Sequence, residues 1–272
     1  MLYSSAGTLL PLGTGGWMAT AERETSAYLW QRGNRTILLD AGSGLRRLGD
    51  CDCLAQLQAT EKIYLFLSHY HLDHTIGFTF LSRFLKPEQT LVICAPDRTL
   101  CYYNPREALE MMLRMPFYHT PFPFLPFHTE IKELHLGEND VDGMPVTVWP
   151  QKHSDTSVGY AFDSTLAYIS DTSVLARAME PCNGVRWLLH EVYYDPTDVA
   201  ELDRNENREA ILHHSCDTEV AEFALQCAAG NLIPIHFNPT HSRERYVAQI
   251  ERLADSIVDL TIPEDGKLIS LG

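Results

Sequence analysis

Short apolar runs of strand length dominate the pattern of hydrophobic and polar positions along the chain. Each run is rich in aliphatic or aromatic residues and is bounded by residues that favour turns, which is typical of β-strands. The runs that we expect to form strands are residues 28–30, 36–39, 63–67, 91–94, 146–149, 158–162, 166–169, 187–189, 232–235 and 267–270. Strands therefore make up most of the predicted secondary structure.

Two helices are predicted between these strands. The clearer one follows Ser215, where Asp217 or Thr218 is the expected N-cap and Gly230 marks the expected end. Apolar side chains recur there at helical spacing, at Val220, Phe223, Ala224 and Cys227. The second helix covers residues 106–115, whose apolar positions leave no clean polar face, so we expect it to pack between other elements.

Residues 116–128 form a segment rich in aromatic residues and prolines. The spaced prolines exclude a helix and a central strand, and large aromatic side chains are unfavourable when they are left in water. We therefore expect an extended, docked loop within an insertion at about residues 99–135. Two interpretations stay open: the loop covers the core or a contact between the subunits of a homodimer, or it forms a hydrophobic wall beside a substrate pocket.

The composition is that of a folded globular protein, with 45% hydrophobic and 21% charged residues among 272. No linker or change in composition divides the chain, so we expect a single domain over residues 1–272. The 21 basic and 36 acidic residues give a net charge of −15, which argues against long nucleic acids as partners. No leader peptide is recognisable and no apolar run approaches the ~18 residues of a membrane span, so a cytoplasmic protein without a membrane partner is expected.

The seven cysteines are an odd number in a chain that is too long to need disulfides for stability. This usage suits a reducing compartment. Cys51 and Cys53 form a weak candidate metal site, because no second cysteine pair accompanies them.

The strongest chemical signal follows the predicted strand at residues 63–67. Three histidines and an aspartate lie within six residues there, at His69, His71, Asp73 and His74. His69 and His71 point the same way if the backbone stays extended, whereas Asp73 and His74 lie where the chain must turn. Burying so many polar groups without a metal is unfavourable, so this segment predicts ligands for two adjacent metal ions.

Further polar residues follow other predicted strands, at the point where each strand ends or in the loop beyond it. They are His153, Asp171, His190, Glu191 and His236. Polar residues at the exits of apolar strands are the usual way in which a layered scaffold assembles a site on one edge. We therefore expect some of these residues to complete the metal site.

These motifs together resemble the metallo-β-lactamase superfamily and, within it, the ribonuclease Z-like phosphodiesterase branch. The resemblance spans nearly the whole chain and rests on Leu39-Asp40-Ala41-Gly42-Ser43-Gly44, the His-x-His-x-Asp-His motif at 69–74, His153, Ser170-Asp171-Thr172, Leu189-His190-Glu191, His214-Ser215 and Ile235-His236-Phe237. It implies an α/β fold, the four-layer αβ/βα sandwich of two mixed sheets flanked by helices, with metals at one edge of the sheets.

The resemblance also implies which residues hold the ions. One ion is assigned to His69, His71 and His153, the other to Asp73, His74 and His236, and Asp171 is the carboxylate that bridges the two. Imidazole and carboxylate ligands suit Zn²⁺, which is favoured here, and also Mn²⁺ or Fe. Such a pair of ions lowers the pKa of a bound water and polarises a phosphoryl or carbonyl oxygen, and Asp73 is placed to orient the attacking water.

Glu191 and His214 distinguish the branch. His214 precedes the predicted helix, so a substrate phosphate would lie near a helix N-terminus, with His214 donating to an oxygen and Glu191 orienting His214. The resemblance implies this pair in the ribonuclease Z branch, which favours a phosphodiester over an acyl substrate. We interpret His190 and His213 as bystanders, and His119, His128, His135 and His241 as residues without a partner pattern.

Departures from the branch pattern bear on the substrate. His213 stands where ribonuclease Z usually has glycine, and Val192-Tyr193 stands where that branch has Ala-Thr after the glutamate. We therefore expect the substrate-facing side of the site to differ in shape from that of ribonuclease Z. No basic, glycine-rich arm for gripping tRNA is present. We therefore predict a metal-dependent hydrolase, a phosphodiesterase acting on a small phosphodiester such as a cyclic nucleotide or a short oligonucleotide.

Other functions remain open beside the phosphodiesterase interpretation. The same ligands would serve an ester, lactone or thioester hydrolase, or a tRNA 3′-end processing endonuclease. A metal-stabilised scaffold without activity is disfavoured by the complete ligand set, and a redox di-iron role by His71, where that branch usually has glutamate. Two glycine-rich stretches, residues 13–16 and the one after Asp40, are expected to be turns, with Asp40 hydrogen-bonding a ligand or the backbone.

Overall fold

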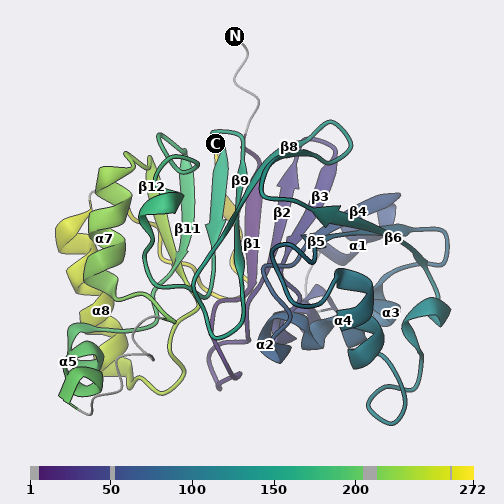
Figure 1. The fold of residues 1–272 in the computed structure, drawn as a ribbon, viewed down its shortest axis with the longest axis horizontal. Coiled ribbons are helices and arrows are strands. Elements are labelled where there is room, and N and C mark those ends of the chain that lie inside the picture. The colour runs from purple at the N-terminus through teal and green to yellow at the C-terminus, as the bar shows by residue number, and fades with distance from the viewer. Residues whose placement is uncertain (1–5, 50–52, 205–212, 258) are drawn as a thin grey trace. The chain divides into compact units, whose positions relative to one another are not determined.

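The computed structural model describes residues 6–49, 53–204, 213–257 and 259–272 (Figure 1). Its contacts group the chain into two compact units, each with its own mixed β-sheet. Unit 1 comprises residues 1–14, 18–135 and 264–272, and unit 2 comprises residues 15–17 and 136–263. Cys51 lies outside the described residues, so the candidate site at Cys51 and Cys53 stays a prediction.

Unit 1 contains a sheet of seven strands in the order β13-β1-β2-β3-β4-β5-β6. The strands are β1 (Thr8–Gly13), β2 (Ala27–Arg32), β3 (Arg35–Leu39), β4 (Lys62–Phe66), β5 (Thr90–Pro96), β6 (His128–Leu134) and β13 (Ile269–Ser270). Pairing is antiparallel from β13 to β3 and parallel from β3 to β6. The parallel strands β3 to β5 are buried on both faces, which is why they read as continuous apolar runs in the sequence.

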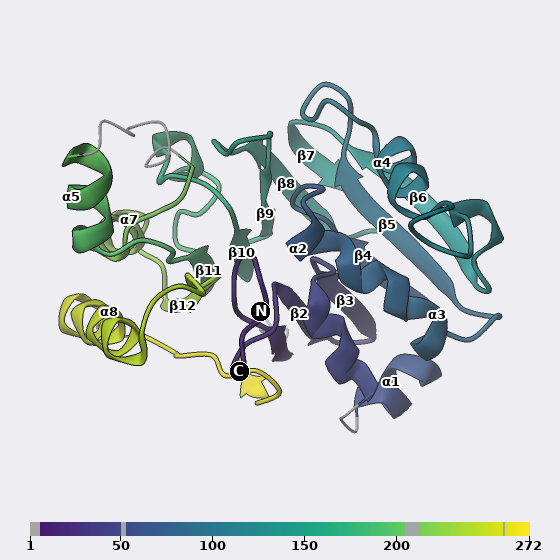
Figure 2. The same cartoon turned by 90° about the horizontal axis from the view of Figure 1, so that it is seen from below.

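Helices of unit 1 pack on one face of this sheet. They are α1 (Cys53–Ala59), α2 (Leu72–Thr75), α3 (Leu81–Phe84) and α4 (Pro105–Met112), with 3₁₀ turns η1 (Ser43–Gly49), η2 (Ile76–Phe80) and η3 (Phe122–Phe124). Leu57 of α1 and Leu81 of α3 join one apolar cluster with alternate strand residues such as Leu65, so α1 and α3 cover the same face (Figure 2). The loops that follow β3 and β4 are thereby held on a rigid base.

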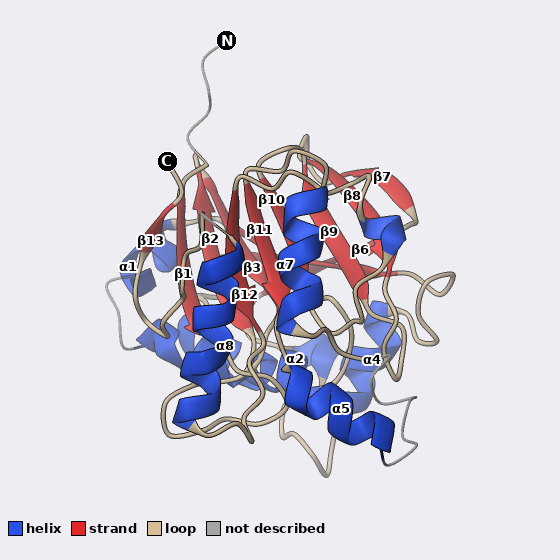
Figure 3. Ribbon diagram, turned by 90° about the vertical axis from the view of Figure 1, so that its left-hand side faces the viewer, coloured by secondary structure: helices blue, strands red, loops and turns tan. Residues whose placement is uncertain are grey.

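Unit 2 contains a sheet of six strands in the order β12-β11-β10-β9-β8-β7. They are β7 (Gly137–Asp140), β8 (Pro145–Pro150), β9 (Val158–Phe162), β10 (Leu166–Ile169), β11 (Trp187–Glu191) and β12 (Asn231–Ile235), accompanied by η4 (Ala176–Ala178), α5 (Pro196–Arg204), α7 (Asp217–Gln226) and α8 (Arg243–Ser256). Strands β10, β11 and β12 are parallel and the others antiparallel. Helices α7 and α8 lie side by side on one face of the sheet, where Phe223 and Leu253 join its core (Figure 3).

Every run predicted as a strand coincides with part of an observed strand, and three further strands of the described ranges were not predicted. Strand β1 contains Pro11, β6 has only Ile131 and Leu134 as aliphatic residues and lies at the sheet edge, and β7 is the polar stretch Gly-Glu-Asn-Asp. The pairing of β6 and β7 is decided by the neighbouring strand rather than by their own apolar content, whereas β1 is apolar and is interrupted by its proline. Among the described helices, none combines the length and the apolar character needed to cross a lipid bilayer.

The helix predicted after Ser215 is α7, but both of its predicted ends were wrong. Its N-cap is Cys216, whose N–H donates to the Glu219 carboxylate at 3.3 Å, and neither Asp217 nor Thr218 caps it. It ends at Gln226, before the expected end at Gly230, and Ala228 has a left-handed backbone with φ of 52°. Cap geometry depends on a single hydrogen bond, which residue type alone does not determine.

The predicted helix at residues 106–115 is α4, which begins earlier and ends earlier than predicted. Asn104 caps it by accepting a hydrogen bond from the Glu107 N–H at 2.9 Å. The aromatic segment 116–128 contains the short turn η3 and reaches β6 at His128. It is docked in part, because Phe122 and Phe127 are buried whereas Phe117 and Phe124 are exposed. The exposed rings leave both interpretations of this loop in place.

The C-terminal segment of the chain is hydrogen-bonded to the connection between β1 and β2 of unit 1. The buried Asp265 carboxylate accepts hydrogen bonds from the Thr14 N–H at 3.0 Å and hydroxyl at 2.7 Å, and from the Glu24 N–H at 2.7 Å. Next to it, β13 pairs with β1, and the Ala6 N–H donates to the Gly272 carbonyl. Residues at opposite ends of the sequence therefore complete one sheet.

A cluster of ion pairs connects α8 to the start of α5 in unit 2. Arg245 donates to both oxygens of Asp195, at 2.7 and 3.0 Å, and also contacts Asp198 at 2.8 Å. Burial raises the pKa of the Asp195 carboxyl group, but the hydrogen bonds from Arg245 outweigh this effect and lower the pKa to about 2. His241 completes the cluster through Asp198 at 2.8 Å, so this histidine has a partner that its sequence context did not indicate.

The depressed pKa of Asp195 makes the stability of unit 2 depend on pH in a defined direction. A carboxyl group whose folded-state pKa is lowered stabilises the fold above its unfolded pKa of about 4, and this contribution is lost as pH falls towards 2. Urea unfolding of Asp195→Asn should therefore show a loss of about 1 kcal/mol at pH 7 that shrinks below pH 4. Glu264→Gln, which removes an exposed ion pair with Lys267, is the control and should change stability little at either pH. A loss that is equal at pH 3 and pH 7 would contradict the assignment.

Candidate metal centre

The histidine motif of unit 1 is held by a buried aspartate that follows the neighbouring strand. Asp40 comes directly after β3 and adopts a left-handed backbone with φ of 56°. Its carboxylate accepts from the Ser68 N–H at 2.7 Å and hydroxyl at 2.8 Å, and it lies 2.7 Å from Nδ1 of His74. Since a carboxylate only accepts, Nδ1 of His74 carries the proton and Nε2 keeps its lone pair. Asp40 thus hydrogen-bonds both the backbone and a predicted ligand, as expected.

Glycine is required where this turn meets the motif. A Cβ on Gly42 would lie 2.3 Å from the carbonyl oxygen of Asp73 and 2.6 Å from that of Ser26. No side chain fits in that space, because the loop after β3 and the start of α2 are in backbone contact. The Asp-Ala-Gly stretch therefore sets the position of α2 and of the residues that it carries.

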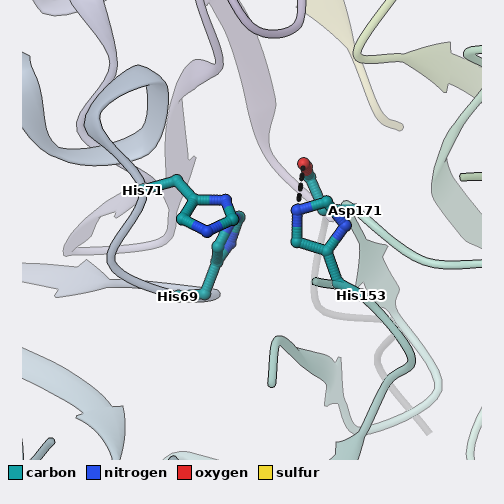
Figure 4. Close-up of side chains that lie close together, drawn as sticks. All are labelled: His69, His71, His153 and Asp171. Atoms are coloured by element: carbon teal, nitrogen blue, oxygen red, sulfur yellow. Dashed lines mark hydrogen bonds and ion pairs between the residues drawn. The ribbon is translucent and has the colours of Figure 1, made fainter. Parts of the chain in front are cut away.

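The four motif residues of unit 1 form two pairs. His69 Nε2 and His71 Nδ1 face one another at 3.0 Å, as Figure 4 shows for these two rings. His74 Nε2 lies 3.3 Å from the carboxylate of Asp73. His69 and His74 are fully buried, whereas His71 and Asp73 are half-buried. The pairing matches the two ligand groups expected from the sequence, His69 with His71 and Asp73 with His74.

In unit 2, the predicted ligands converge on Asp171 at the end of β10. Its two carboxylate oxygens face different imidazoles. Oδ1 lies 3.0 Å from Nε2 of His236. Oδ2 lies 3.5 Å from Nε2 of His153, the contact that Figure 4 draws as a dashed line. Ser170 donates its hydroxyl to Oδ1 at 2.8 Å. A carboxylate that presents one oxygen to each of two histidines has the form required of a bridging ligand.

Each of these histidines is oriented through its other ring nitrogen. His153 Nδ1 donates to the carbonyl oxygen of His213 at 3.0 Å, and His236 Nδ1 faces Glu191 at 3.3 Å. Burial lowers the pKa of His153, against the opposing effect of Asp171, so its neutral form is favoured. In both cases Nε2 is the nitrogen left facing Asp171.

Glu191 is the centre of a second hydrogen-bond network in unit 2. It is fully buried at the end of β11, where Oε1 accepts from the backbone N–H groups of Thr172 at 2.6 Å and Ser215 at 3.1 Å. Oε2 lies 2.9 Å from Nδ1 of His214 and 3.3 Å from Nδ1 of His236. Burial raises the pKa of the Glu191 carboxyl group, but the neighbouring His214 and His236 outweigh this effect and hold the pKa below its ordinary value. The carboxylate is therefore charged and fixes both imidazoles.

Tyr193 packs on the same two imidazoles. Its ring stacks on His214 with the centroids 4.1 Å apart and lies 5.7 Å from the ring of His236. The N–H groups of Tyr193 and Tyr194 both donate to the Ser215 carbonyl, at 3.1 and 3.0 Å. Because Tyr193 covers a face of the His214 ring, it restricts ring rotation and directs the nitrogen that Glu191 does not hold.

The donor chemistry of these residues fits divalent metal ions. His69 Nδ1 donates to Ser68, so its Nε2 is an acceptor that faces His71. The Nε2 atoms of His153 and His236 likewise face carboxylate oxygens of Asp171. At Asp171 an imidazole acceptor thus faces a carboxylate acceptor on each side, and a shared cation removes the repulsion between such groups. Neutral imidazoles and ionised carboxylates are ligands that Zn²⁺, Mn²⁺ and Fe accept.

Some contributions were missed by the sequence interpretation. His213, taken as a bystander, supplies the carbonyl that orients His153, and no side-chain pattern could have shown a backbone contact. Tyr193 was noted only as a departure from the branch pattern. His190 is buried against Phe223, and His135 contacts Asp97 at 2.5 Å. The acidic cluster around Asp195 is neutralised by Arg245, which argues against a metal there.

Comparison with known proteins agrees with this chemistry. The family profile described as "Beta-lactamase superfamily domain" matches residues 35–237. A ribonuclease Z from Thermococcus sibiricus is 24% identical over 318 aligned residues, covering 96% of this chain and 95% of that protein. A ribonuclease Z from Archaeoglobus fulgidus is 30% identical over 55% of this chain, which is 45% of its own length.

Two solved structures share the fold at low identity. The metallo-beta-lactamase fold protein YhfI from Bacillus subtilis has a TM-score of 0.71 and 18% identity, covering 97% of this chain and 99% of its own. A diphosphatase from the PhnP family has a TM-score of 0.69 and 18% identity, covering 97% of both chains. The predicted fold class, two mixed sheets flanked by helices in the metallo-β-lactamase arrangement, is confirmed.

The contact between Asp40 and His74 gives a prediction about metal affinity. Replacing an acid that orients a ligating histidine typically weakens metal binding about 10- to 100-fold. Asp40→Asn tolerates the left-handed backbone but removes the charge, so it should weaken Zn²⁺ binding by that factor in a chelator competition. Asp97→Asn is the matched control, since Asp97 also contacts a histidine, His135, outside the predicted ligand set. Equal losses in the two variants would contradict the role of Asp40.

Proposed function

The chain belongs to the beta-lactamase superfamily, and from this premise we propose that it is a metal-dependent phosphodiesterase acting on a small phosphodiester such as a cyclic nucleotide or a short oligonucleotide. We propose that it holds two divalent ions, Zn²⁺ first among them. The proposed ligands are His69, His71, Asp73, His74, His153, Asp171 and His236. The pairing of these residues within each unit and the two-sided contacts of Asp171 support this assignment.

The observation that carries the choice of a phosphodiester is the pair formed by Glu191 and His214. Glu191 holds Nδ1 of His214 at 2.9 Å, which leaves Nε2 for the substrate. A general acid on the departing oxygen helps to expel an alkoxide, the poor leaving group of a nucleotide phosphodiester. The backbone N–H of Ser215 bonds to the same carboxylate, so the imidazole and the start of α7 are held together.

Bound divalent ions would supply an activated water and stabilise charge on the phosphoryl oxygens. The residues of the chain provide the remaining functions. Asp73 is half-buried beside His74, where its carboxylate is available to orient the attacking water. His214 would donate the proton that the leaving oxygen needs, and Glu191 would stabilise the protonated imidazole.

Substrate size is argued from charge and from the relatives. The net charge of −15 disfavours a long polyanion, and the insertion at about 99–135 has no basic, glycine-rich arm. The full-length similarity to a ribonuclease Z favours tRNA 3′-end processing as the second candidate function. Side-by-side rates on a precursor tRNA and on a panel of cyclic nucleotides and dinucleotides distinguish the two, and equal efficiency on tRNA would reject the small-substrate proposal.

The first test is the initial rate of bis(p-nitrophenyl) phosphate hydrolysis by protein of known metal content. We expect turnover that a chelator abolishes and that Zn²⁺ or Mn²⁺ restores. Asp171→Ala should lose at least one of the two ions and nearly all activity, because it removes an oxygen from each proposed ion. Asp255→Ala, an exposed acid at the end of α8, is the control. Two ions and full activity in Asp171→Ala would overturn the ligand assignment.

A second variant separates phosphodiester from acyl chemistry. His214→Ala should lower kcat for a phosphodiester about 10²-fold or more while the metal content stays unchanged, since His214 is proposed as the acid and not as a ligand. His119→Ala, an exposed histidine, should leave kcat unchanged. If His214→Ala is fully active, or if the wild type turns over only esters, lactones or thioesters, the phosphodiesterase proposal fails.

A further inference from the structure

Trp17 differs from the other tryptophans of the chain in its exposure. Trp30 and Trp149 are buried and Trp187 is half-buried, whereas 61% of Trp17 is exposed. A single exposed apolar side chain is common and needs no explanation by itself. The surroundings of Trp17 are what point to a binding role.

Trp17 ends a short segment of unit 2, the Gly15–Trp17 strap, that is bonded to the residue after a proposed metal ligand. The Gly16 N–H donates to the Phe237 carbonyl at 2.9 Å, and Gly15 forms a parallel bridge with Phe237. A Cβ on Gly16 would lie 2.4 Å from Cε1 of His236, so the strap backbone lies directly on that imidazole. The indole is therefore attached one residue away from the atoms that touch His236.

The backbone at Trp17 is strained. Its φ of 58° is in the left-handed region, which bulky side chains rarely occupy and which is usually left to glycine. His236 has a φ of 55° across the same bridge. Residues held in such conformations concentrate at sites that bind ligands, because only strong surrounding contacts maintain them. The two residues before Trp17 are held by their contacts with Phe237, which fixes where the chain enters Trp17.

A second aromatic side chain adjoins the same imidazole. The ring of Tyr193 lies 5.7 Å from that of His236 and is half-buried. The strap itself, Gly-Gly-Trp followed by Met18, carries no charge. Beside a proposed phosphodiester centre, flat and uncharged aromatic surfaces favour a planar ring over a second phosphate.

We propose that Trp17 is a stacking surface for the nucleobase next to the scissile phosphate, so that the substrate class is a nucleotide phosphodiester rather than an alkyl or sugar phosphodiester. This inference rests on the proposed function for the location of the phosphate. Its own content is the preference for a planar base, and that preference can be measured by binding, without turnover.

The test compares two phosphate monoesters, adenosine 5′-monophosphate and ribose 5-phosphate, which share the sugar and the phosphate and differ in the base. Calorimetric titration of the metal-loaded wild type should show the nucleotide binding about 5- to 150-fold more tightly, the range for one base stacked on an aromatic side chain. Trp17→Ala should abolish this ratio without changing the affinity for ribose 5-phosphate. Trp17→Phe should retain most of the ratio.

A control variant and a fluorescence measurement test whether the base contacts Trp17 itself. Met18→Ala alters the neighbouring, exposed side chain and should leave the ratio unchanged. The nucleotide should quench wild-type tryptophan fluorescence, and Trp17→Phe should lose the quenching while it still binds. Circular dichroism verifies that each variant is folded. Equal affinities for the two ligands in the wild type, including no measurable binding of either, overturn the proposal, as does an unchanged ratio in Trp17→Ala.

The outcomes separate this inference from the proposed function. Hydrolysis of phosphodiesters without any preference for the base would leave the phosphodiesterase proposal standing and reject the role of Trp17. A base preference that depends on Trp17, in a protein that hydrolyses no phosphodiester, would establish the stacking surface and reject the proposed reaction.

Discussion

The buried carboxylate of Glu191 is the constraint on which most of the unit 2 site depends. A charged group with no solvent contact is stable only if donors surround it. The N–H groups of Thr172 and Ser215 and the His214 imidazole donate to Glu191, and Nδ1 of His236 lies 3.3 Å from it. These groups come from the ends of β10 and β12 and from the segment before α7, so one side chain fixes the geometry of three connections. Asp40 has the same role in unit 1, where it joins the loop after β3 to Ser68 and His74. In each unit an acid buried at a strand end orients an imidazole.

This arrangement explains how an acidic chain tolerates so many buried polar groups at strand ends. Hydrogen bonds from backbone N–H groups and neighbouring imidazoles compensate Asp40 and Glu191. In unit 1 the Asp73 carboxylate faces Nε2 of His74, and in unit 2 the Asp171 carboxylate faces Nε2 of both His153 and His236. The local excess of acceptors is what a divalent ion relieves, so rigidity and metal affinity have the same origin. Tyr193 adds a packing constraint to the hydrogen bonds by covering the His214 ring.

The strand positions and the candidate ligands could be predicted because both depend on patterns within short stretches of the sequence. The runs before Ser68 and Asp171 are continuously apolar since parallel strands are buried on both faces, and polar residues at their ends stand out against them. What could not be predicted depends on contacts between distant segments. The cap at Cys216, the carbonyl of His213 and the pairing of the polar strand β7 are decided by a partner that lies elsewhere in the chain.

The pairing of β13 with β1 has a consequence for the order in which the protein folds during synthesis. Residues 264–272 complete the unit 1 sheet and place Asp265 on Thr14, yet they leave the ribosome only after residues 136–263 of unit 2 have been made. Until then the outer edge of β1 has no partner, and such an edge is open to pairing with other chains. Unit 2 can form most of its sheet from one continuous stretch of sequence. Strand β1 is thus synthesised well before its partner β13, and in this interval the nascent chain is exposed to aggregation.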